Sequence, residues 1–62
     1  MKKVNRVNLL DPISNKNQVG FGYKVSEDTW RVKTITGIHR VFEDKVSEVF
    51  RSKNDVGFIN FN

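Results

Sequence analysis

Apolar and polar residues alternate along the segment 19–35, which is the clearest pattern in the chain. The first stretch holds Val19, Phe21, Tyr23 and Val25, and the second holds Trp30, Val32 and Thr34. A period of two is typical of strands with one buried face. The segment 26–29 between them is polar and suits a turn. The pattern therefore predicts a β-hairpin over 19–35.

The turn length sets the register that we expect for this hairpin. If Val25 pairs with Trp30 across four residues, Tyr23 faces Val32, and the large apolar side chains share one face. We expect that face, including Phe21, to form the core. The opposite face then carries three cations beside two glycines: Lys24, Arg31, Lys33, Gly20 and Gly22.

The spacing of apolar residues changes after Gly37 and predicts a helix over about 38–53. The stripe consists of Ile38, Val41, Phe42, Val46, Val49 and Phe50, which suits a period of 3.6. An alternative has a tight turn at 36–37, a third strand over 38–42 and a helix that starts only at Glu43. We favour the longer helix.

The two ends of the chain carry weaker patterns. Residues 56–61 predict a final strand with apolar side chains on both faces, so that one face is either covered or open to a partner. Residues 1–10 alternate imperfectly and suit an N-terminal strand, while residues 1–17 as a whole suit a loosely ordered arm. The expected fold is a single α+β domain over 1–62, with a small antiparallel sheet packed on one helix.

The length and the charge of the chain limit the kinds of function that it can have. With 62 residues, the chain holds one small core of marginal stability. It contains no cysteine, so neither a disulfide nor a thiolate ligand is available. The net charge of +4 lies entirely in residues 1–36, because residues 37–62 balance. A basic excess in one half favours an anionic partner such as nucleic acid.

No residue pattern supports catalysis or a cofactor. His39 is the only histidine, and Glu43 and Asp44 are neighbours that point apart on a helix. The carboxylates match no zinc or calcium spacing. We expect a non-enzymatic protein without metal or cofactor.

The mixture of aromatic and basic residues in the hairpin is the strongest functional signal. Such mixtures form stacking platforms for nucleic acid, although the core of so small a protein needs the aromatics first. We therefore expect phosphate contacts from cations on the outer hairpin face and near the N-terminus. The candidate nucleic-acid-binding residues are Lys24, Arg31, Lys33, Lys2, Lys3 and Arg6.

The segment from Trp30 through Gly37 and Arg40 into the predicted helix resembles the small sheet-and-helix arm-binding domains of phage integrases. The resemblance covers about half the chain and suggests a mechanism rather than an ancestry. It implies a sheet laid in a DNA groove, and so favours DNA over RNA as the partner.

The alternative function is a small inhibitor or adaptor that binds protein through an exposed apolar strand or sheet edge. A homodimer would offset the marginal core and is a further alternative. The basic start leads into no apolar run of 7–15 residues, so we expect no signal peptide. No stretch is apolar enough for a membrane helix, and a cytoplasmic location is expected.

Overall fold

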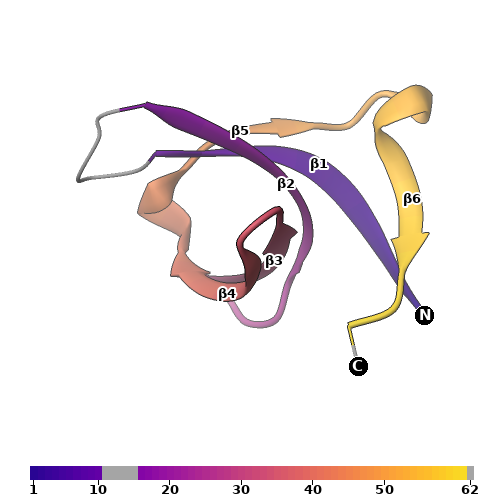
Figure 1. Cartoon of the computed structure of the whole chain (residues 1–62), viewed down its shortest axis with the longest axis horizontal. Helices are drawn as coiled ribbons and strands as arrows, with labels where there is room; N and C mark the ends of the chain where they lie inside the picture. The colour runs from indigo at the N-terminus through magenta and orange to yellow at the C-terminus, as the bar shows by residue number, and fades with distance from the viewer. Residues whose placement is uncertain (11–15, 62) are drawn as a thin grey trace.

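The residues that the structure describes form one strongly curved antiparallel sheet without an α-helix (Figure 1). The computed structural model describes residues 1–10 and 16–61. The elements are β1 (Lys2–Leu10), β2 (Asn17–Lys24), β3 (Thr29–Thr34), β4 (Gly37–Phe42), the 3-10 helix η1 (Glu43–Lys45), β5 (Val46–Phe50), the 3-10 helix η2 (Lys53–Asp55) and β6 (Val56–Ile59).

A short connection rolls the sheet. The strand order is β4-β3-β2-β1-β5, and β6 also pairs with β1. β4 and β5 therefore lie at opposite ends of the order, yet η1 joins them across only about 6 Å, given a rise of roughly 2 Å per residue. The sheet must curl until these edges approach. His39 and Val41 of β4 accordingly line the same hollow as Leu9 of β1.

The core lies inside the roll. Its buried members are Val7, Leu9, Trp30 and Val32, with Val41, Val46 and Val49 packed against them. These residues come from β1, β3, β4 and β5, while β2 contributes two glycines to the inner face. The core therefore depends on pairings between distant parts of the chain, as expected for a rolled sheet.

The helix predicted over 38–53 is wrong: these residues form β4, η1, β5 and the start of η2. Val41, Val46 and Val49 do face the core, but from two strands. The intervening η1, together with a register shift between Asn8 and Leu9 on β1, spaces them in a way that imitates a helical stripe. The sequence contains nine valines and no alanine, a composition that favours strands over helices.

The alternative of a tight turn followed by a strand over 38–42 matches the structure in this segment. Gly37 has φ of +123°, a conformation that side chains rarely adopt, and it opens β4. The described elements include no α-helix beside the sheet, and the likeness to the integrase arm-binding domains, which needs one, is therefore removed.

The register predicted for the hairpin is wrong by one residue. Lys24, rather than Val25, pairs with Trp30, so Tyr23 stands opposite Arg31 and not opposite Val32. The turn is closed by the Val25 amide, which donates to the Thr29 carbonyl at 2.9 Å. A shift of one residue moves every side chain of β2 to the other face relative to its partner strand.

Close packing of β3 on β2 explains this register. A Cβ placed on Gly20 would lie 2.6 Å from Val32 Cγ1, and one on Gly22 would lie 2.5 Å from the Arg31 carbonyl oxygen. No side chain fits between the strands at these positions. The glycines therefore face the core, and Phe21 and Tyr23 face outward.

The two chain ends pack together on the outer face. β6 pairs with the first residues of β1, which places the termini near each other (Figure 1). Phe61 is only 7% exposed and meets the Tyr23 ring edge-to-face, with 5.1 Å between centroids. Val4 is fully buried, and the register of β1 with β2 continues to place it beside Tyr23. β1 pairs with β2, β5 and β6, so it is the central strand of the sheet.

We predict that Trp30→Ala lowers the free energy of unfolding by about 3–5 kcal/mol, because it empties an aromatic site in the core. Chemical denaturation measures the loss. Ile35→Ala is the control, since Ile35 is 96% exposed and its truncation should change stability by less than about 0.5 kcal/mol. Unchanged stability in Trp30→Ala would contradict the core assignment.

We predict that Gly22→Ala destabilises the protein by about 1–3 kcal/mol, because the added methyl group overlaps the backbone of β3. Gly57→Ala is the matched control. A Cβ there meets nothing within 4 Å, so the substitution should be neutral or stabilise by about 0.4–1 kcal/mol. Equal effects of the two substitutions in thermal unfolding would rule out the packing explanation.

Candidate nucleic-acid interface

A row of alternating aromatic or aliphatic and cationic side chains crosses the outer face of the sheet. Direct register pairs connect its five members, one from each of five adjacent strands. From β5 to β4 these are Phe50, Arg6, Phe21, Lys33 and Ile38. Their chain neighbours Val7 and Val32 are fully buried, which shows that the row lies on the face away from the core.

A second row runs beside the first on three of these strands. Tyr23 stands opposite Arg31, and Arg31 stands opposite Arg40. We call the six residues of β2, β3 and β4 in the two rows the outer patch: Phe21, Tyr23, Arg31, Lys33, Ile38 and Arg40. The patch contains three cations, two aromatic rings and no acid.

Four of the six side chains of the outer patch are exposed, and Tyr23 and Arg31 are half-buried. Phe21 is 37% exposed and Ile38 is 40% exposed, while Lys33 and Arg40 are also exposed. Strands lie about 4.8 Å apart and alternate residues about 6.7 Å apart along a strand. The rings and charges are therefore spaced on the scale of neighbouring nucleotides.

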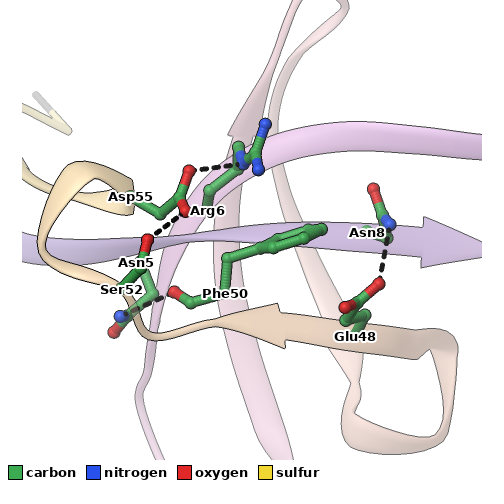
Figure 2. Close-up of polar contacts among 7 residues, drawn as sticks. All are labelled: Asn5, Arg6, Asn8, Glu48, Phe50, Ser52 and Asp55. Atoms are coloured by element: carbon green, nitrogen blue, oxygen red, sulfur yellow. Dashed lines mark hydrogen bonds and ion pairs between the residues drawn. The ribbon is translucent and has the colours of Figure 1, made fainter.

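Arg6 lies in the first row but is engaged within the protein (Figure 2). Its Nε is 2.8 Å from Asp55 Oδ1, in an ion pair that lacks the direction of a hydrogen bond. Its guanidinium also lies over the Phe50 ring, 4.1 Å from the centroid. Arg6 therefore ties the η2 connection and β5 to β1, with part of its charge neutralised.

Polar contacts around Arg6 support the same connection. The Asn5 side-chain amide donates to the Phe50 carbonyl at 3.0 Å, and the Ser52 hydroxyl donates to Asp55. Figure 2 shows these groups gathered where β5 leads into η2. The Asp55 carboxylate that pairs with Arg6 is thereby held in place.

Lys24 does not share a face with Arg31 and Lys33, contrary to the predicted register. It pairs opposite Trp30, and its ammonium donates to Glu43 Oε1 at 2.9 Å. This hydrogen bond lowers the pKa of the Glu43 carboxyl below its ordinary value of 4.5. Lys24 is thus compensated by an acid and lies outside the outer patch.

The structure separates the two lysines near the N-terminus. Lys2 Nζ lies over the Tyr23 ring, 5.5 Å from the centroid, on the side of the outer patch. Lys3 stands opposite Phe58 and points to the other face of β1. Of the six predicted residues, Arg31, Lys33 and Lys2 therefore gather at the patch, Arg6 lies beside it, and Lys24 and Lys3 lie elsewhere.

Four residues of the outer patch were missed from the sequence. Ile38 and Arg40 fell in the predicted helix, while Phe21 and Tyr23 were assigned to the core. The signal that identifies the two rings is the pair of glycines that alternate with them. Glycine on the inner face of a curved strand permits close packing, and this moves the neighbouring rings outward.

Acidic groups mark one boundary of the patch. Asp28, Glu43 and Asp44 line a shallow hollow together with Phe42. Their charge opposes the approach of phosphate at this end, although Phe42 is well exposed. The patch is thus positive over its two rows and is bordered by acid beyond Arg40.

The described residues contain no group of three or more histidine, aspartate or glutamate side chains arranged to hold a metal ion. Nor do residues 1–10 and 16–61 include a helix with the length and apolar character to span a bilayer. The comparison with protein families, curated proteins and solved structures found no match for this chain.

We predict that the Glu43 carboxyl titrates below pH 4.5 in the folded protein and that Lys24→Gln raises its pKa, because the hydrogen bond is lost. In the unmodified protein, the ionised Glu43 carboxylate therefore contributes to stability above about pH 4.5. This contribution is lost as the pH falls through the lowered pKa. An NMR titration of side-chain carboxyl carbons measures both midpoints.

Lys45→Gln is the control for this titration, because it removes another lysine near Glu43 and leaves the Lys24 hydrogen bond intact. A midpoint at or above 4.5 in the unmodified protein, or equal midpoints in the two variants, would contradict the assignment.

Proposed function

We propose that the protein binds single-stranded nucleic acid through the outer patch, as an accessory or regulatory factor that performs no chemistry. The observation that carries the proposal is the two-row arrangement on one exposed face. Phe21 supplies an exposed ring there and Tyr23 a half-buried one, and Arg31, Lys33 and Arg40 supply cations. Rings that stack on bases and cations that contact phosphates are the two components of single-strand binding surfaces.

Ion pairs that neutralise cations outside the outer patch support the patch as the binding surface. Lys24 is paired with Glu43 and Arg6 with Asp55, so these cations are less available to phosphate. Lys33 lies between Phe21 and Ile38 on neighbouring strands. A phosphate at Lys33 thus leaves the adjoining base within reach of an exposed ring.

The ring exposure favours a single strand over a duplex. Phe21 projects from the convex side of the roll and can meet a base face only where the base is unstacked. A duplex would meet the cations but not the rings. Single strands of DNA and of RNA both offer base faces and phosphates, so both are included in the test.

A second candidate function is protein binding through the β4 edge. Among the described strands β4 pairs only with β3, and Phe42 at its end is 65% exposed. A free edge can accept an extended segment of another protein. Pull-downs from nuclease-treated and untreated lysate separate the two candidates, since partners that survive nuclease favour the edge and partners that disappear favour the patch.

We predict that the protein binds single strands more tightly than duplexes of the same sequence, with an affinity that falls steeply as salt rises. Fluorescence anisotropy at two salt concentrations, with DNA and RNA probes, measures this. Phe21→Ala should cost about 1–3 kcal/mol, the contribution of one base stacked on a ring. Lys33→Gln should lower the slope of log affinity against log salt by about one.

Lys24→Gln is the matched control for Lys33→Gln, because it removes the same charge from the other face of β2 and β3. It should leave the salt slope unchanged. Failure to bind any probe at low salt would overturn the proposal, as would equal losses in the two lysine variants.

A further inference from the structure

A hollow of about 160 Å³ lies at the end of the second row of the outer patch. Among its lining residues are Lys2 of β1, Tyr23 of β2, Arg31 of β3 and Phe61 after β6. Tyr23 and Arg31 also belong to the outer patch, so the hollow and the patch form one continuous surface.

Two cations are held over one pair of rings at this hollow. Lys2 Nζ is 5.5 Å from the Tyr23 ring centroid, and Arg31 Cζ is 5.5 Å from the Phe61 centroid. The two rings meet edge-to-face at an angle of 77°. Arg31 also donates to the Phe61 carbonyl at 3.4 Å, which uses one of its five N–H donors. The remaining donors can serve a ligand.

Among the described residues around the hollow, no carboxylate forms an ion pair with Lys2 or Arg31. None of the described residues that line the hollow is acidic, in contrast to the Asp55 that faces Arg6 and the Glu43 that faces Lys24. Cation–π contacts position Lys2 and Arg31 without neutralising them. The hollow is therefore suited to a small anion that both cations can contact.

Phe61 closes the hollow on one side. The residue is 7% exposed and its ring packs on Tyr23, so the second row ends here. A strand lying on the patch would stop here. A terminal phosphate carries close to two charges, and an internal phosphodiester carries one, so two cations favour the terminal group.

We propose that this hollow binds a terminal phosphate, a phosphate monoester, at the end of a strand whose bases lie on the outer patch. The inference rests on the proposed function for its ligand, since the patch supplies the rest of the strand. A mononucleotide or free inorganic phosphate offers the same chemistry, and the experiment separates these sources.

The experiment compares one oligonucleotide carrying a 5′ phosphate, a 3′ phosphate or neither, with a mononucleotide and inorganic phosphate as further probes. We expect one phosphorylated end to bind about tenfold more tightly than the unphosphorylated strand, the effect of a charged hydrogen bond. Lys2→Gln should abolish this preference for the phosphorylated strand.

Lys3→Gln is the control, because it removes the neighbouring charge from the opposite face of β1 and should preserve the preference. Both lysines are exposed, and thermal unfolding of each variant checks that the fold is intact. Equal binding with and without phosphate, or equal effects of Lys2→Gln and Lys3→Gln, would overturn the inference and leave the outer patch standing.

A different result would overturn the proposed function and keep only the phosphate site. If the mononucleotide or inorganic phosphate bound and Lys2→Gln abolished this binding, while no oligonucleotide bound more tightly than the mononucleotide, the hollow would be a phosphate site without a strand on the patch.

Discussion

The close contact between Val32 and the backbone of β2 governs how tightly the sheet rolls and which side chains face outward. With no side chain at Gly20 or Gly22, β3 can pack directly against the inside of β2. The sheet can then roll tightly enough for the three residues of η1 to join its two ends. The same contact sets the hairpin register, which turns Phe21 and Tyr23 outward. Core packing and the composition of the outer surface therefore have one cause.

Rolling also decides which charges are neutralised. Asp55 and Glu43 lie far along the chain from Arg6 and Lys24, and the fold brings each carboxylate to its cation. Asp55 and Glu43, two acids of the second half of the chain, thus form ion pairs away from the outer patch. The net positive charge is left concentrated over the outer patch and the hollow beside it, where Arg31, Lys33, Arg40 and Lys2 lie without an acid among them.

A chain of this size buries little surface, and it compensates by using both faces near its ends. The inner core stops at Val7, while Val4 and Phe61 are buried on the outer side against β2. This second apolar contact stabilises the central strand where β6 pairs with it. It also fixes Tyr23 and Arg31, so the residues that support the ends of the chain form part of the proposed site.

The amino-acid sequence is enough to predict where the chain is extended within 19–35, that Trp30 and Val32 belong to the core, and that the basic excess lies in the first half. Alternation and composition are local properties, and they suffice for these points. Only the tertiary structure decided the register of β2, because a shift of one residue keeps the alternation and exchanges the faces. The tertiary structure was also needed to show that Val41, Val46 and Val49 come from two strands. The short η1 between these strands spaces the three valines along the sequence as one face of a helix would. The outer patch could not be predicted for the same reason: its rings and cations meet across strands whose pairing is set by packing on two glycines.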